Sequence, residues 1–235
     1  MAGVIWLCES GLKRSINQDR AGAFVDDGRG VFFVADGLGG HYAGEKASAV
    51  VADMVERWWH LNCKTLPSME VAAHLLQRLL QECDRIIRRE TPPGKICGTT
   101  AVLLLIDQGA YVLLSVGDSR CYWVPDGFIV PGIQLLTVDD VVPEASPGSG
   151  KLYRAIGGGP KGPIAVQCGT IDRSGLFVLC TDGIYKFCSQ HLFYSQLRRA
   201  ARTRDMEQAA IKIERAVCKN GAPDNYSLVL VQVGD

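Results

Sequence analysis

Short runs of valine, isoleucine, leucine and phenylalanine recur along this chain of 235 residues, and turn signals separate them. Three of the signals are Asp26-Asp27-Gly28, Asp107-Gln108-Gly109 and Asp126-Gly127. Strands that follow one another so closely pair as antiparallel hairpins, whereas parallel strands need a longer crossover connection. The pattern therefore predicts mostly antiparallel sheet, with a last strand at residues 226–233.

Longer segments with the apolar spacing of helices interrupt the strands. They cover residues 43–61, 68–90, 191–201 and 205–218. In the second segment, one apolar stripe comprises Val71, Leu75, Leu79, Cys83, Ile86 and Ile87. Strands interrupted by pairs of helices are typical of sheets covered by helices, so the chain is assigned to the α+β class. Between Val138 and Gly162 the sequence turns to proline, glycine and serine, which predicts a surface loop.

The composition is that of an ordinary globular protein. Hydrophobic residues make up 47% of the chain and the formal net charge is zero. We expect one domain, residues 1–235, and no binding to nucleic acid or anionic membrane, because there is no overall basic field. The apolar runs are too short to span a bilayer, and the first residues lack a basic region followed by a long apolar stretch. The expected location is the cytoplasm.

Cysteine usage points to a reducing compartment. Nine cysteines are scattered along the chain, with no CxxC pair. Several lie inside apolar runs, where cysteine behaves as a small buried hydrophobe. A zinc site is not predicted.

Aspartates stand beside several of the strand-like runs. Asp36 follows VFFVA, Asp118 follows LLSVG, Asp182 follows LFVLCT, and Asp224 precedes the last strand. Carboxylates at strand ends of one sheet core can converge, and converged carboxylates repel unless they are protonated or meet a counter-charge. Clusters of oxygen ligands suit hard divalent cations such as Mg²⁺ or Mn²⁺. The pattern predicts a metal site.

Six motifs in order carry a family resemblance. They are RSINQD at residues 14–19, VADGLGGHYAGEKAS at 34–48, GTT at 98–100, VGDSR at 116–120, TDGIY at 181–185 and DNYS at 224–227. A lone DG pair is usually only a turn. Together and in this order, the motifs resemble those of the type 2C (PPM) metal-dependent serine/threonine protein phosphatases, in their bacterial stand-alone form. In length the chain is similar to members encoded with type VI secretion systems.

The resemblance implies a four-layer αββα sandwich, in which two antiparallel sheets are flanked by helix pairs and a two-metal centre lies at one end. Asp36 would bridge the two ions. The other implied ligands are the Gly37 carbonyl, Asp182 and Asp224, with Asp19 acting directly or through water. Asp118 and Asp182 match the ligands of a third, weaker ion found in bacterial members.

The implied cofactor is Mn²⁺ or Mg²⁺. Two such cations about 3.5 to 4 Å apart can share a water, lower its pKa toward neutrality and present it in line with phosphorus. No protein nucleophile is then required. Both ions keep several waters, so a few carboxylates leave positions open for substrate.

Arg14 and His41 are candidates for substrate chemistry. Arg14 matches the phosphate-binding arginine of the family, and a guanidinium can grip two phosphoryl oxygens; the alternative is an exposed loop arginine. His41 stands in the bacterial DG-x-GGH pattern. It either protonates the leaving alkoxide as a general acid or donates a structural hydrogen bond in its loop. His60, His74 and His191 are expected to be structural or solvent-facing.

Asp118 has an alternative role to metal binding, because in GDSR its carboxylate could pair with Arg120 and stabilise a hairpin. The chain also departs from the family pattern at residues 137–140, which read Thr-Val-Asp-Asp and lack the usual histidine. The segment at residues 141–152, before Arg154-Ala155-Ile156-Gly157, is short for the flap of bacterial members. Flap contacts help to choose substrates, so specificity does not carry over from relatives.

The leading functional hypothesis is an enzyme. It would hydrolyse phosphoserine and phosphothreonine by direct attack of a metal-bridging water, oppose a eukaryotic-like Ser/Thr kinase and its targets, and act as a monomer. The alternative is a non-catalytic phosphatase-fold protein that serves as a regulatory binding partner. A structural calcium-binding β protein would need a closed cage of oxygens, and no EF-hand loop is visible.

Overall fold

Two antiparallel sheets form the centre of the molecule in the computed structural model, which describes residues 3–38, 43–127, 132–142, 151–158 and 162–234. The first sheet has the strand order β1 (Gly3–Glu9), β13 (Tyr226–Val233), β12 (Gly175–Cys180), β7 (Arg120–Pro125), β8 (Gln134–Leu135). The second has the order β11 (Ala165–Thr170), β6 (Ala110–Val116), β5 (Ala101–Asp107), β3 (Arg29–Leu38), β2 (Asp19–Asp26). The short strand β4 (Gly98–Thr99) pairs with the end of β3, and β9 (Val141–Val142) pairs with β10 (Lys151–Leu152). The sequence prediction of antiparallel hairpins is confirmed, including the turns after β2 and β5.

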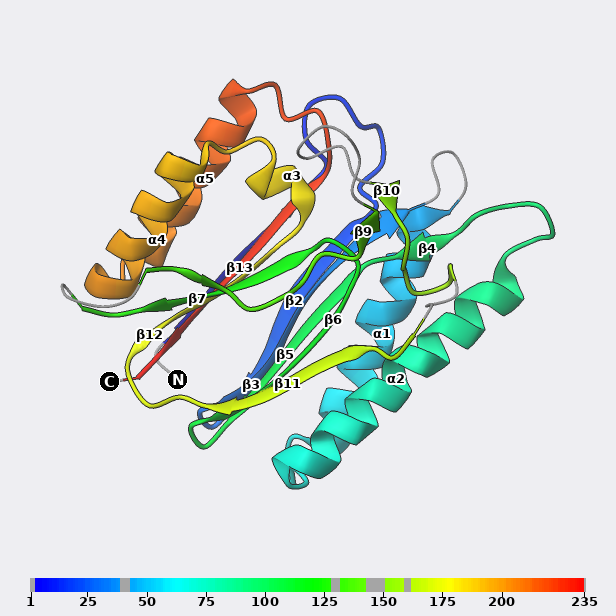
Figure 1. The fold of residues 1–235 in the computed structure, drawn as a ribbon, viewed down its shortest axis with the longest axis horizontal. Coiled ribbons are helices and arrows are strands. Elements are labelled where there is room, and N and C mark those ends of the chain that lie inside the picture. Colours follow the sequence, from blue (N-terminus) through cyan, green and yellow to red (C-terminus); the bar gives the residue numbers. More distant parts are fainter. Residues whose placement is uncertain (1–2, 39–42, 128–131, 143–150, 159–161, 235) are drawn as a thin grey trace.

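Helices cover the outer face of each sheet (Figure 1). The pair α1 (Gly44–Asn62) and α2 (Met69–Glu90) packs on the second sheet. The pair α4 (Gln190–Thr203) and α5 (Met206–Lys219) packs on the first. A single turn, α3 (Asp182–Tyr185), follows β12 and was not predicted. The four-layer αββα arrangement expected from the resemblance is confirmed.

The core consists of three apolar layers, because each central strand is buried on both faces. Phe32 and Val34 of β3 point between the sheets, where Phe177 and Val229 lie, while Val31 and Phe33 face α1 and α2. The region under α4 and α5 contains Leu228, Leu230 and the buried residues of those helices. Strands buried on both faces read as continuous hydrophobic runs, which explains why VFFVA and LFVLC show no alternation.

The apolar stripe predicted for residues 68–90 is partly wrong. Val71 is 48% exposed, whereas Leu76 and Leu80 are fully buried. The helix packs against α1 as well as β6 and β11, so its buried band is wider than one stripe and is centred one position later. Its start is as expected, because the Ser68 side chain accepts a hydrogen bond from the Val71 N–H.

The surface loop predicted between Val138 and Gly162 is also partly wrong. Asp140, Ala155 and Ile156 are buried, and Ile156 exchanges backbone hydrogen bonds of 2.9 Å with Thr99. Part of the predicted loop, residues 143–150 and 159–161, lies outside the described residues.

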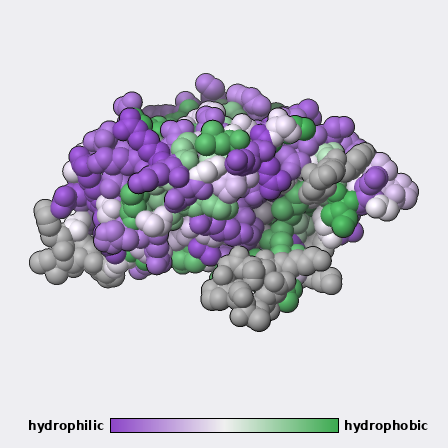
Figure 2. Space-filling model, turned by 90° about the horizontal axis from the view of Figure 1, so that it is seen from above, coloured by the Kyte–Doolittle hydropathy of each residue, from purple (hydrophilic) through white to green (hydrophobic). Residues whose placement is uncertain are grey.

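The outer surface carries mainly hydrophilic residues on the face shown in Figure 2, with hydrophobic residues in small groups. Trp58 and Trp59 are buried in the core. His60, His74 and His191 are exposed, in agreement with the expectation that they are structural or solvent-facing. Within the described residues, none of the helices has both the length and the apolar character needed to span a bilayer.

Candidate metal centre

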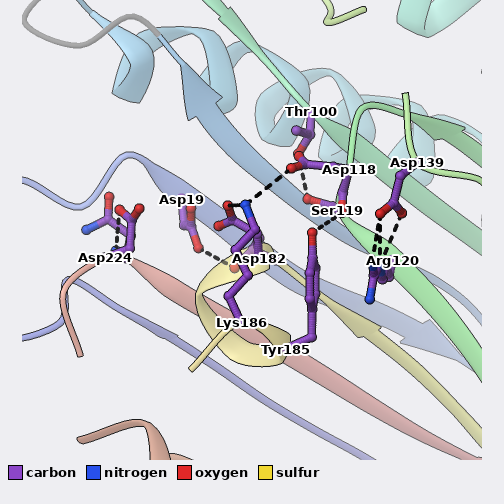
Figure 3. A network of polar contacts seen from close by, with 12 residues as sticks. Asp19, Thr100, Asp118, Ser119, Arg120, Asp139, Asp182, Tyr185, Lys186 and Asp224 are labelled. Carbon is purple, nitrogen blue, oxygen red and sulfur yellow. Dashed lines mark hydrogen bonds and ion pairs between the residues drawn. The ribbon is translucent and has the colours of Figure 1, made fainter. Parts of the chain in front are cut away.

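Asp19 joins the two sheets at one end of the sandwich. On the second sheet it lies directly opposite Asp36, its cross-strand partner. Its side chain is fully buried, and Oδ2 accepts hydrogen bonds of 2.8 Å from Thr181 Oγ1 and Ser227 Oγ, both on the first sheet side. A carboxylate on β2 is therefore held by Thr181, which directly precedes Asp182, and by Ser227, the second residue of β13. Figure 3 draws Asp19 together with Asp118, Asp182 and Asp224.

The GTT motif holds the backbone of Asp36. The Asp36 N–H donates to Thr100 Oγ1 at 2.9 Å, and the Asp36 carbonyl accepts from the Thr100 N–H at 2.8 Å. Thr100 Oγ1 also lies 2.7 Å from Ser119 Oγ, in the turn that carries Asp118. One threonine thus links two of the candidate ligands, which gives GTT a positioning role.

Two glycines allow chain segments to approach within van der Waals distance. A Cβ on Gly37 would lie 2.3 Å from the Gly44 carbonyl oxygen and 2.6 Å from that of Gln18. A Cβ on Gly183 would lie 1.9 Å from the carbonyl oxygen of Asn225. The DG pairs therefore need glycine because the neighbouring motif lies against it, which is a stronger reason than the formation of a turn.

The turn that carries Asp118 is held from two sides. The Gly117 N–H donates to Asp140 Oδ2 at 2.9 Å, and the Tyr185 hydroxyl donates to the Asp118 carbonyl at 3.0 Å. Arg120 pairs with Asp139, at 2.7 Å from Nη2 to Oδ2, and its guanidinium lies 3.7 Å over the Tyr185 ring. In this structure Arg120 is thus engaged by Asp139, and the alternative in which Asp118 pairs with Arg120 is wrong.

The aspartates at the departure from the family pattern are structural supports that the sequence did not reveal. Asp139 fixes Arg120. Asp140 accepts from Gly117 and forms a buried ion pair with Arg154, with 2.7 Å between Oδ2 and Nε. The sequence contained a signal, since two adjacent acids stood where a histidine was expected, but their partners are defined only by the fold.

The candidate carboxylates lie close enough to influence one another. Burial is the main cause that raises the pKa of Asp19 to about 7, and the charges of Asp182 and Asp224 add to it. Burial, followed by the charges of Asp19, Asp182, Asp118 and Asp224, places the pKa of Asp36 well above its usual range. Burial and the charge of Asp182 raise the pKa of Asp118 to about 6. Such a cluster is stabilised by positive charge.

Two basic side chains supply part of that charge. Arg14 makes a bidentate ion pair with Asp224, at 2.9 Å from Nε to Oδ1 and 3.0 Å from Nη2 to Oδ2. Lys186 Nζ lies 2.7 Å from Asp182 Oδ2 and 3.8 Å from Asp118 Oδ2. Lys186 was not predicted from the sequence, although its spacing of four residues from Asp182 is the spacing of ion pairs on a helical turn.

The donor set fits divalent cations in chemistry. It consists of carboxylates, and the Oδ1 atom of Asp19 is buried with no hydrogen-bond partner. As the side chains stand, no three Asp, Glu, His or Cys groups in the described ranges are arranged to hold one ion together. Asp182 and Asp224 form ion pairs with Lys186 and Arg14 instead. The structure therefore brings the predicted ligands to one end of the sheets without closing them into a cage.

His41 lies outside the described residues, as do Gly39 and Gly40. Gly37 is on β3, where it pairs with Thr99 of β4. Beside Arg14, a hollow of about 370 Å³ is lined by Lys13, Arg14, Ser15, Ile16, Gln18, Ala43 and Glu45.

Comparison with known proteins gives the family. Residues 12–218 match the protein phosphatase 2C family, and the chain belongs to it. The chain is 26% identical to the serine/threonine phosphatase stp of Listeria monocytogenes serotype 4b (strain F2365) in an alignment 238 positions long that covers 95% of this chain and 93% of that protein.

Solved structures share the fold. The catalytic domain of the serine/threonine protein phosphatase PstP, in complex with two manganese ions, has a TM-score of 0.79 at 23% identity and covers 99% of this chain and 98% of that one. PppA, a key regulatory component of T6SS in Pseudomonas aeruginosa, has a TM-score of 0.77 at 22% identity, covering 98% and 97% of the two chains.

Proposed function

We propose that this member of the protein phosphatase 2C family hydrolyses phosphoserine and phosphothreonine in proteins by direct attack of water on phosphorus. The observation that carries the proposal is the meeting of Asp19, Asp36, Asp118 and Asp182 across two sheets, where burial and then mutual repulsion raise the pKa values of Asp19, Asp36 and Asp118. A purely structural cluster would not be expected to gather so much unbalanced charge.

A pair of Mn²⁺ or Mg²⁺ ions, when bound, supplies an activated water and positive charge for the phosphoryl group. Asp36 is the proposed bridging ligand, and Gly37, Asp182 and Asp224 are the proposed outer ligands, with Asp19 beside them. Asp19 suits this role because two hydroxyls already fix its Oδ2. The buried Oδ1 is left to coordinate an ion or to accept a hydrogen bond from a water bound to the ion. Asp118 and Asp182 match the ligands of a third, weaker ion, and Lys186 contacts this same pair of acids.

Arg14 is the proposed substrate-binding residue. Its side chain is 48% exposed, reaches Asp224, and borders the hollow that Lys13 also lines. A phosphoryl group in this hollow would offer oxygens to the same two N–H groups, at Nε and Nη2, that now contact Asp224. Arg14 would then hold the phosphate and neutralise charge that develops during attack.

His41 is retained as the proposed general acid for the leaving serine or threonine alkoxide. The alternative, a structural hydrogen bond within its loop, separates from it in the pH profile. Loss of a general acid removes the alkaline limb of kcat for substrates with poor leaving groups and leaves p-nitrophenyl phosphate hydrolysis little changed.

The domain organisation, oligomeric state, protein substrates and cellular location are proposed as well. Residues 1–235 would form one catalytic domain that acts as a monomer on phosphoproteins, among them a Ser/Thr kinase and its targets. The cytoplasm suits nine cysteines that form no disulfide. A place beside type VI secretion is proposed from the length and form of the chain, and the solved structure of PppA has the same fold.

The test is hydrolysis of p-nitrophenyl phosphate and of a phosphothreonine peptide by the purified chain. Activity should require added Mn²⁺ or Mg²⁺ and should vanish after chelation. Full activity in the chelated protein would contradict the proposal. No activity with any ion would favour a regulatory binding role, which no specific observation now supports.

A further inference from the structure

Lys186 occupies an unusual position for a lysine, between two acids of the candidate metal centre. Its Nζ atom is 2.7 Å from Asp182 Oδ2 and 3.8 Å from Asp118 Oδ2. The side chain is 34% exposed, and the side chains of Asp182 and Asp118 are only 18% and 12% exposed. Figure 3 shows Lys186 extending from α3 toward this pair.

The fold holds the lysine in this place. Lys186 ends the single turn α3, and its N–H donates to the Asp182 carbonyl at 3.0 Å, so the two residues share one helical turn. The preceding residue, Tyr185, binds the Asp118 carbonyl through its hydroxyl. Tyr185 lies in turn under the Arg120 guanidinium, which Asp139 anchors. Packed neighbours therefore fix the distance between the Lys186 backbone and the turn that carries Asp118.

The charge of the ammonium is retained in this environment. Burial acts to lower the pKa of Lys186, but the hydrogen bond to Asp182 and the charges of Asp182, Asp118 and Asp36 outweigh it, so the pKa is raised. For Asp118, the charge of Lys186 opposes the effects of burial and Asp182. The lysine thus neutralises part of the acidic cluster on the side away from Asp224 and Arg14.

A divalent ion shared by Asp118 and Asp182 would need to approach their oxygens to about 2.0 to 2.6 Å. The ammonium already contacts Oδ2 of Asp182 and faces Oδ2 of Asp118, so an ion there would meet a cation at close range. Resting on the function proposed above, we infer that the Lys186 ammonium takes the place of a third divalent ion, and that this chain binds two ions and no more. Asp182 then gives Oδ2 to the lysine and keeps Oδ1 for the pair.

The inference is tested by counting Mn²⁺ ions bound to the full chain by isothermal titration calorimetry and equilibrium dialysis. Wild type should bind two. Lys186→Met, which keeps the length and removes the charge, should bind a third ion with millimolar affinity. Lys186→Arg keeps the charge and should remain at two. Lys64→Met, at an exposed position after α1, is the matched control and should also remain at two.

A count of three in wild type, or a count of two in both wild type and Lys186→Met, would overturn the inference. A wild type that binds no Mn²⁺ would instead contradict the proposed metal centre itself. Wild-type crystals soaked in Mn²⁺ give a reading that does not depend on the folding of any variant. Anomalous scattering should place ions near Asp36 and none between Asp118 and Asp182, and a peak between those two residues would refute the role of Lys186.

Discussion

At the scale of the residue, the candidate acids lie where burial makes their charge unfavourable, and hydrogen bonds and ion pairs from neighbouring side chains hold them in place. Asp19 is the clearest example, because two hydroxyls hold one oxygen while the other is buried without a partner. Asp36, Asp118, Asp182 and Asp224 were identified as candidates from their places beside strands, and Asp19 was identified from the family resemblance. The partners Lys186, Thr181 and Ser227 could not, because hydrogen bonds between segments distant in sequence depend on how the sheets pack.

Asp182→Asn tests the ligand assignment. The amide keeps the size of the side chain and removes the negative charge, so kcat should fall by about two orders of magnitude or more while the fold remains. Circular dichroism and steady-state kinetics at saturating Mn²⁺ check both parts. Asp53→Asn, at an exposed position on α1, is the control and should behave as wild type. An unchanged rate for Asp182→Asn would remove this residue from the centre.

Arg14→Ala should weaken phosphate binding more than metal binding. The variant loses the guanidinium N–H groups that would hold phosphoryl oxygens, so the Ki of inorganic phosphate and the KM should rise about tenfold or more. Mn²⁺ affinity should stay the same or increase, because Asp224 loses its cationic partner. The opposite order of effects would make Arg14 a support of the metal ligands.

Metal-free protein should lose stability as the pH rises. Asp19 has an ordinary pKa of 3.8 and a pKa of about 7 in the folded chain, so folding favours its protonated form. The associated stability is present in full below pH 4 and is lost between about pH 4 and 7; for a group so deeply buried it is on the order of a few kcal/mol. In EDTA, the Tm should be higher at pH 5.5 than at pH 8.

Added Mn²⁺ should reverse this trend, because it binds the ionised carboxylates and stabilises the folded state at the higher pH. Asp19→Asn should flatten the pH dependence of the metal-free protein. A Tm in EDTA that climbs between pH 5.5 and pH 8 would show that the carboxylates do not repel one another as described.

At the scale of the element, the strands deliver the acids and close contacts set their spacing. The last strand, Tyr226–Val233, lies where the sequence predicted it, because apolar runs bounded by turn residues identify buried strands well. The α2 stripe was misplaced because its apolar residues lie on several faces, and only contact with α1, β6 and β11 determines which are buried. The one-turn helix α3 is too short to show a helical period.

Gly183→Ala tests the contact between α3 and β13. The new Cβ would lie 1.9 Å from the Asn225 carbonyl oxygen, so the two segments must separate. We expect a loss of about 2 kcal/mol or more in the free energy of unfolding and a large loss of activity, since both Asp182 and Asp224 adjoin the contact. Urea denaturation and kinetics measure these. Gly132→Ala is the control, because its nearest atom is an Arg198 nitrogen at 3.8 Å.

At the scale of the whole molecule, the two sheets bring together candidate ligands that neither sheet carries alone. The second sheet supplies Asp19 and Asp36, and the segments adjoining the first supply Asp182 and Asp224. The motif order in the sequence was sufficient to predict the αββα sandwich and the family. The motif order did not predict which partners the carboxylates have, because the ion pairs of Asp224 with Arg14 and of Asp182 with Lys186 arise only in the folded chain.

The most direct test of the central claim is the anomalous difference map of crystals grown with Mn²⁺. We predict two peaks about 3.5 to 4 Å apart, with Asp36 between them, Asp224 released from Arg14, and Asp182 directed at the ions through Oδ1 while Oδ2 stays with Lys186. A map in which Asp224 keeps its ion pair with Arg14, and no peak lies within coordination distance of Asp36, would contradict this prediction.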